Sequence, residues 1–122
     1  MDSPPAEDPP VLDAAVMAAI RSLGAPGEPD VYAQIAQLFL ADVPVHLSAL
    51  RTAIADNSAE SVRQIAHRLR GGTLEMGARR MAPVCAALER GAHAGSLADA
   101  SGFADTLDRE FAAVRAALEK EL

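Results

Sequence analysis

The chain has 122 residues, half of them hydrophobic, which is enough for one domain with a single core. Its formal net charge of −6 argues against nucleic acid or an anionic membrane as the main partner, because clustered Lys and Arg lead binding to either. Aromatic residues make up 3% and tryptophan is absent, while alanine and leucine are abundant, so an all-α fold is predicted.

The chain divides into a short arm and one domain. Residues 1–10, MDSPPAEDPP, are acidic and rich in proline, which predicts a disordered arm or a linker. Residues 11–122 are predicted to form one helical domain. Its first helix is short, with Asp13 as N-cap, Leu23 on its apolar side and Gly24 placed to end it.

A long second helix follows, with Asp30 as its cap and apolar residues every three or four positions as far as Ile54. Pro44 lies inside this helix and removes one backbone hydrogen bond. The apolar pattern continues past the proline without a change of phase. We therefore expect a bend between Leu40 and Pro44 and not a division of the helix.

A third helix is predicted from a turn at residues 55–58 to Met76 and Gly77. Asn57 and Glu60 have the spacing of a capping box at its start. At about 100° per residue, its apolar side chains gather within about 40° of one direction, which predicts a buried stripe. The stripe consists of Val62, Ile65, Ala66, Leu69, Thr73 and Met76.

His67 lies roughly 140° from this stripe, so we expect it to be exposed. One turn later come Gly71 and Gly72, although a glycine inside a helix costs about 1 kcal/mol relative to alanine. Small residues there would let a large partner approach the imidazole. Imidazole is a nucleophile near neutral pH, and Arg63 and Arg70 lie one turn to either side to offset phosphoryl charge. The pattern favours phosphate chemistry.

A fourth helix is predicted to end at Gly95. Pro83 leaves two starts open for it. The helix begins at about Ala82, with Arg79 and Arg80 in an irregular turn, or it begins earlier with distorted first turns.

The last helix is predicted to start at Ser96 as N-cap, and its apolar residues from Leu97 to Leu118 repeat at heptad spacing. Four long amphipathic helices with short connections predict an antiparallel up-down-up-down four-helix bundle. The short first helix would cap one end.

The stretch around His67 resembles the histidine-containing phosphotransfer (HPt) family. The signature of that family is a histidine, any residue, leucine, lysine and glycine, then a glycine–alanine pair. The matching positions are His67, Leu69, Arg70, Gly71, Gly77 and Ala78. The likeness extends over nearly the whole chain through Leu12, Asp13, Phe39, Pro44, Cys85, Leu88 and Glu89.

Two positions depart from the family pattern. Arg70 stands in place of the usual lysine, which keeps the charge and changes its shape. Gly72 stands where serine is commoner, which removes a hydroxyl able to contact phosphate.

The resemblance implies a phosphocarrier of a two-component multistep phosphorelay, not an enzyme. His67 would accept a phosphoryl group from the aspartate of one response-regulator receiver domain and pass it to another. The residues that would hold the phosphate or admit the partner are Arg63, Gln64, Arg70, Gly71, Gly72 and Leu74. Mg²⁺ would come with the receiver, because this chain has no acidic cluster next to His67, and we expect no cofactor or metal in it.

Leu74 lies roughly 20° from His67 on the third helix and is expected to be exposed. Together with Val11, Leu12 and Ala15 of the first helix it would form a docking surface.

The other histidines serve as internal controls. His46 lacks arginine and glycine neighbours of this kind, and His93 lies in the last turn of its helix, so we interpret both as structural. The histidines lie on different helices, and Cys85, the single cysteine, is predicted to point into the core, which argues against a metal carrier.

A rival hypothesis is a helical adaptor that docks a receiver or another protein without phosphoryl transfer. Binding without labelling would favour it. We expect a cytoplasmic monomer with no direct contact to nucleic acid or membrane. The pattern leaves open whether the chain is free-standing or the C-terminal domain of a hybrid sensor histidine kinase, which would tether it to a membrane.

Overall fold

Five helices make up the fold in the computed structural model, which describes residues 10–25, 27 and 30–122. They are α1 (Ala14–Arg21), α2 (Val31–Ala55), α3 (Ala59–Met76), α4 (Met81–His93) and α5 (Ala100–Glu121). These described ranges contain no strand, so the all-α prediction is confirmed. Nearly all of the predicted N-terminal arm, residues 1–9, lies outside the described residues.

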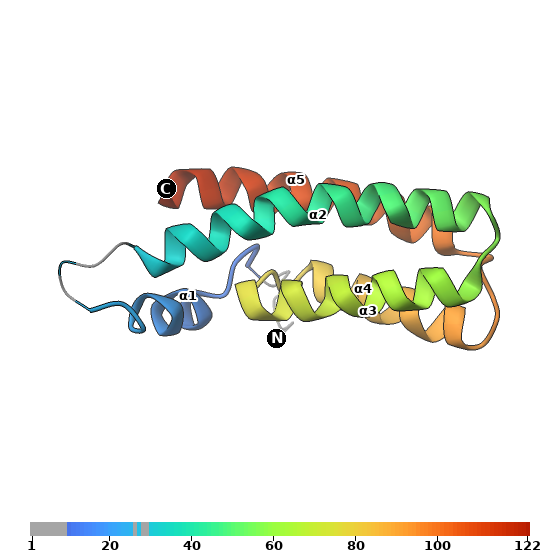
Figure 1. Ribbon diagram of the computed structural model, residues 1–122, viewed down its shortest axis with the longest axis horizontal. Helices are drawn as coiled ribbons and strands as arrows, with labels where there is room; N and C mark the ends of the chain where they lie inside the picture. The colour runs from blue at the N-terminus through green and yellow to red at the C-terminus, as the bar shows by residue number, and fades with distance from the viewer. Residues whose placement is uncertain (1–9, 26, 28–29) are drawn as a thin grey trace, which may run out of the picture.

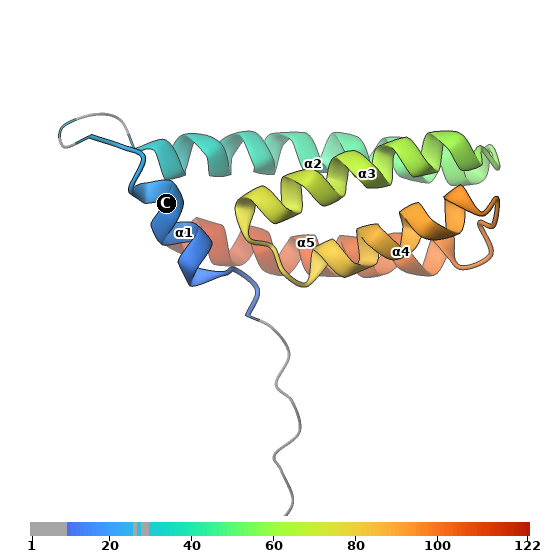
Figure 2. The ribbon, with the colours of Figure 1, turned by 90° about the horizontal axis from the view of Figure 1, so that it is seen from below.

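The four long helices form one bundle, and consecutive helices run in opposite directions (Figure 1). α3 packs against α2 and α4, and α5 packs against α2 and α4, so each helix has two neighbours in the bundle. α1 lies across the end of the α3–α4 pair and contacts α2 and α3 (Figure 2). The structure is thus the predicted up-down-up-down bundle with a short capping helix.

Each bundle helix turns one apolar side to a common core. The predicted stripe of α3 is buried except for Ile65, which is half-buried against the core. Thr73, a buried polar residue of this stripe, donates its hydroxyl to the carbonyl of Arg70 at 2.8 Å. The stripe fixes the rotation of α3, and with it the direction of every side chain on the opposite face.

Pro44 lies inside α2 without dividing it, as predicted. By length and mean hydropathy, α2 is the described helix that could cross a membrane, but a core helix of a bundle meets the same criterion. Its residues from Tyr32 to Ala53 include seven that are buried, and the helix packs on α3 and α5. We therefore interpret α2 as a core helix.

The predicted end of the first helix was two residues too late. Asp13 caps α1 as expected, with its carboxylate accepting from the backbone N–H of Ala15 at 2.9 Å. After Arg21, however, the chain tightens into a turn closed by bonds from Leu23 to Ile20 and from Gly24 to Arg21. Leu23 is 72% exposed and takes no part in the core.

The predicted capping box at the start of α3 was wrong. Asn57 has a positive φ of 55°, a conformation that asparagine tolerates, and it belongs to the turn that ends α2. Ser58 is the N-cap of α3, and Glu60 pairs with Arg63 instead of reaching back.

The start of the last helix was also predicted too early. The N–H of Ser96 donates to the carbonyl of Gly91 at 2.8 Å, so Ser96 completes the end of α4. α5 starts only after Asp99. At the other end of α4, the helix begins at Met81, one residue before the later of the two predicted starts, with Arg79 and Arg80 in a turn. Its first turn accepts Pro83, since no backbone N–H is needed there.

Candidate functional site

His67 lies at the middle of α3, on the face opposite the buried stripe. Its side chain is 63% exposed, as predicted. Its neighbours Ala66 and Leu69 are buried, so the helix beneath the imidazole is held firmly by the core. The site therefore presents an accessible imidazole on a rigid support.

Glu89 of α4 joins His67 and Arg70. One carboxylate oxygen lies 2.9 Å from Nδ1 of His67, and the other accepts from Arg70 at 3.0 Å. The hydrogen bond from His67, helped by the charge of Arg70, holds the pKa of Glu89 below its usual range. A carboxylate only accepts hydrogen bonds, so Nδ1 carries the proton and Nε2 keeps its lone pair.

Arg63 and Gln64 lie on the same exposed face but turn toward the start of α3. Arg63 donates to both carboxylate oxygens of Glu60, at 2.9 and 2.6 Å, and Gln64 donates to one of them at 3.2 Å. The Arg63 guanidinium lowers the pKa of Glu60 to about 2. A role of Arg63 and Gln64 in holding phosphate stays a prediction.

Two kinds of glycine flank the site. A Cβ added at Gly71 or Gly72 would meet nothing within 4 Å, so packing inside the protein does not require either glycine. At Gly77, φ is +78° and a Cβ would lie 3.0 Å from the Cβ of Val16. Gly77 ends α3 and lets α1 pack, and its carbonyl accepts from the N–H of Asp13 at 2.9 Å. Gly71 and Gly72, in contrast, leave open space beside His67.

The predicted docking surface on the first helix is only partly available. Leu74 is 57% exposed and Ala15 is exposed. Val11 and Leu12 are half-buried and pack against the core, so they anchor the chain ahead of α1.

Comparison with known proteins identifies the family to which the chain belongs. The model of the Hpt domain matches residues 34–117, which include α3, α4 and the site. The chain belongs to the Hpt domain family. It is similar to the crystal structure of histidine-containing phosphotransfer protein B (HptB) from Pseudomonas aeruginosa PAO1. The sequences are 32% identical, the match covers 93% of this chain and 96% of that chain, and the TM-score is 0.86. The comparison with curated proteins gives no match.

Membership of the Hpt domain family confirms the resemblance seen in the sequence. It gives the chain a histidine phosphotransfer role in a phosphorelay, carried out by a phosphocarrier and not by an enzyme.

Glu89 is the residue of this Hpt site that sequence reasoning missed. It was part of the family likeness, but no role was assigned to it. A signal was present, because Glu89 follows the buried Leu88 and lies one turn after the buried Cys85, at the border of the apolar side of α4. Only 19% of the Glu89 side chain is exposed. A carboxylate that is buried to this extent needs a hydrogen-bonding or charged partner.

Among the described residues, neither the remaining histidines nor the cysteine forms a hydrogen bond with His67. His46 is half-buried on α2, and His93 is exposed at the end of α4. Burial raises the pKa of the Cys85 thiol to about 12, so it stays protonated at neutral pH and is unreactive. The part of the chain that the structure describes has no group of three His, Cys, Asp or Glu residues arranged to hold a metal ion.

Proposed function

We propose that His67 accepts a phosphoryl group from the aspartate of one receiver domain and donates it to the aspartate of another. The observation that carries this proposal is the His67–Glu89 hydrogen bond of 2.9 Å beneath an exposed imidazole. It leaves Nε2 as the nucleophilic nitrogen.

The transfer needs an attack by Nε2 in line with the bond that breaks. The Nε2–P bond forms while the P–O bond to the aspartate breaks, and the electron pair of that bond stays on the receiver's carboxylate. The imidazole ring becomes positively charged, because Nδ1 keeps its proton. The carboxylate of Glu89 lies against that nitrogen and stabilises the charge. The reverse sequence returns the phosphoryl group to a second receiver.

We propose that Arg70 contacts the transferred phosphoryl group. One of its donors binds Glu89, but its side chain is 42% exposed and other donors of the guanidinium stay available for phosphoryl oxygens. We assign Mg²⁺ to the receiver, since Glu89 is already engaged by His67 and Arg70.

The decisive experiment measures transfer from a panel of radiolabelled phosphorylated receiver domains. We expect label on the wild type that is lost in acid and kept in alkali, as for phosphohistidine. The His67→Gln variant should take no label, and the His46→Gln variant should take as much as the wild type. Both variants should keep wild-type helicity by circular dichroism.

Label that survives in His67→Gln would overturn the assignment of the acceptor. Receiver binding without any label on the wild type would favour the adaptor hypothesis.

We also propose that the carrier acts as a cytoplasmic monomer, alone or as the C-terminal domain of a hybrid sensor histidine kinase. Support for a monomer comes from the site, which α3 and α4 of a single chain complete. Light scattering at micromolar concentration tests the oligomeric state, and a mass of twice 12.7 kDa would contradict it.

A further inference from the structure

Glu60 lies in the first turn of α3, seven residues before His67. At about 100° per residue the two side chains differ in direction by roughly 20°, so they share one face of the helix. The Glu60 side chain is 65% exposed. Its carboxylate accepts from Arg63 at 2.9 and 2.6 Å and from Gln64 at 3.2 Å. Glu60 therefore occupies both polar side chains that lie one turn before the imidazole.

The other arginine beside the imidazole is held in a different way. Arg70 also binds a carboxylate, that of Glu89, but Glu89 binds His67 as well. Glu60 forms no hydrogen bond with His67 among the described residues. A change at Glu60 can therefore alter the charges near the imidazole without removing the hydrogen bond that orients it.

Arg63 lies within reach of the imidazole. Side chains four residues apart on a helix are neighbours, and each leans toward the N-terminus of the helix, so His67 leans over the turn that carries Arg63. The hydrogen bond from His67 lowers the pKa of Glu89 most, and the charges of Arg70 and Arg63 lower it further. The guanidinium of Arg63 thus already acts on the carboxylate that touches the imidazole.

The charges of this surface balance before phosphorylation, because two arginines pair with two carboxylates. A phosphoryl group on His67 would add a charge of about −2 and three oxygens that accept hydrogen bonds. Such a group is a stronger partner for a guanidinium than a single carboxylate. Arg63 can change partner at little cost, since its pair with Glu60 is exposed and contributes little to stability.

We propose that Glu60 is a positioning residue that holds Arg63 in the unphosphorylated protein and competes with the phosphoryl group for it. On phosphorylation of His67, Arg63 exchanges the carboxylate of Glu60 for phosphoryl oxygens. This competition limits the stability of phosphohistidine, so the phosphoryl group can be passed on to a second receiver. The inference rests on the proposed function.

The first test measures how label divides at equilibrium between a phosphorylated receiver and His67. Both proteins are kept dilute, so that the ratio does not depend on how tightly they dock. Glu60→Gln releases Arg63 for the phosphoryl group and should shift the ratio toward the carrier by about twofold to fivefold. An unchanged ratio, or a shift toward the receiver, would overturn the inference.

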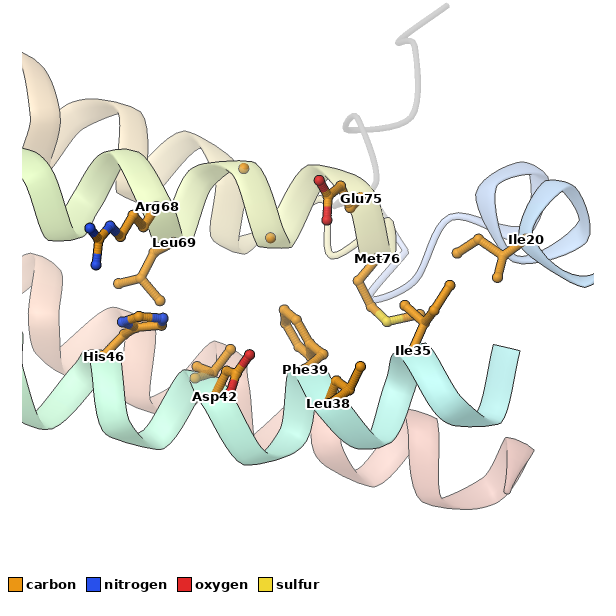
Figure 3. Close-up of a pocket in the computed structure, with 13 residues that line it drawn as sticks. Ile20, Ile35, Leu38, Phe39, Asp42, His46, Arg68, Leu69, Glu75 and Met76 are labelled. Atoms are coloured by element: carbon orange, nitrogen blue, oxygen red, sulfur yellow. The ribbon is translucent and has the colours of Figure 1, made fainter. Parts of the chain in front are cut away.

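Glu75→Gln is the matched control for charge. Glu75 lies on α3 eight residues after His67 and lines a groove between α2 and α3 (Figure 3). Along the helix axis, Glu60 and Glu75 are about 10 and about 12 Å from His67. Glu75 forms no hydrogen bond or ion pair with a described residue, so its loss releases no arginine. Glu75→Gln should shift the ratio by less than about 1.5-fold, and a shift equal to that of Glu60→Gln would overturn the inference.

A double variant tests whether Glu60 acts through Arg63. In the Arg63→Ala background, Glu60→Gln should change the ratio by less than about 1.5-fold, because no arginine is left to release. A purely structural role of Glu60 at the start of α3 would change the free energy of unfolding and leave the ratio unchanged. A full effect of Glu60→Gln without Arg63 would overturn the inference.

Phosphoramidate separates this inference from the proposed function, because it loads His67 without a receiver. Its P–N bond breaks as the Nε2–P bond forms, and ammonia leaves. Nε of Arg63 donates to Glu60 in the unphosphorylated protein, so its ¹H–¹⁵N signal should move when His67 is loaded. A signal that stays in place would overturn the inference.

The two proposals can fail separately. If the Arg63 signal moves on loading but no receiver exchanges label with His67, the proposed function is overturned and the exchange of partners by Arg63 stands. If neither phosphoramidate nor any receiver labels His67, both are overturned.

Discussion

On the α4 side of α3 the charges around His67 are paired with one another, whereas on the α2 side they are left unpaired among the described residues. Glu89 binds both His67 and Arg70 on the first side. Arg68 and Glu75 form no such bond on the second side, and two glycines keep it open. We call the α4 side of α3 the closed side, because its contacts hold the imidazole in place. We call the α2 side the open side, because it leaves room for a partner beside the imidazole. Under the proposed function, one face of α3 would orient the nucleophile and the other would leave room for the partner.

The largest effect should come from filling the open side. Gly71→Leu should lower transfer from a receiver by about a hundredfold, since a side chain there would displace the partner from His67. The fold should gain up to about 1 kcal/mol, because leucine is a better helix former than glycine.

Gly102→Leu is the matched control for this change. Gly102 is an exposed helical glycine of α5 whose Cβ would also meet nothing within 4 Å. In Gly102→Leu, the free energy of unfolding in urea should rise by a similar amount, and the rate of phosphoryl transfer should equal that of the wild type. Wild-type transfer in Gly71→Leu would mean that the partner does not approach from this side.

Breaking the closed side should have the next largest effect. Glu89→Gln removes the carboxylate that orients His67 and offsets its charge, so transfer should fall by about tenfold to a hundredfold. Imidazole ¹⁵N spectra should show a larger share of the Nε2-protonated tautomer, a change that a purely structural role would not produce. Glu60→Gln, which removes the partner of Arg63, should leave the tautomer unchanged.

Arg70 should matter less than Glu89. Arg70→Ala should slow transfer by about fivefold, as expected for loss of a partly exposed charge contact. Arg70→Lys restores the residue usual in the family and should recover most of the rate. Arg79→Ala removes another exposed arginine and should have no effect on transfer. A rate equal to that of the wild type in Arg70→Ala would exclude contact with the phosphoryl group.

Substitutions at the ends of the helices should change the free energy of unfolding and leave the rate of phosphoryl transfer unchanged. Asp13→Ala removes the side-chain cap of α1 and should cost about 1 kcal/mol in urea unfolding. Asp99 precedes α5 without a side-chain cap bond, so Asp99→Ala should cost less than about 0.5 kcal/mol. Equal losses would show that the cap bond of Asp13 is not what stabilises α1.

The smallest effect concerns pH. The pKa of Glu89 is lower in the folded chain than in the unfolded one, so its ionised form adds stability at neutral pH. This contribution should be lost as the pH falls through the folded-state pKa. The free energy of unfolding should therefore differ between wild type and Glu89→Gln by less than about 1 kcal/mol at pH 7, and this difference should shrink as the pH falls through the folded-state pKa of Glu89. A difference that grows in acid would contradict the assigned ionisation.

The parts of the site that were predictable from the sequence depend on one helix only. The apolar stripe of α3 sets the outward direction of His67 and the open position of Gly71, and both follow from spacing along that helix. The contact of His67 with Glu89 depends on how α4 is rotated against α3, which no pattern within either helix contains. The ends of the helices were harder to predict from the sequence. Ser96 and Asp99 are both suitable N-caps, and only the hydrogen bond from Ser96 back to Gly91 shows that α5 starts after Asp99.

The antiparallel order of the helices has a consequence for how the site forms. Both sides of His67 come from the neighbours of α3 in sequence, joined to it by turns at residues 56–58 and 77–80. Local hairpins of this kind form fast, because little chain entropy is lost in closing them. The contacts around the histidine can therefore assemble during synthesis before α5 is complete, and α5 then closes the core beneath them.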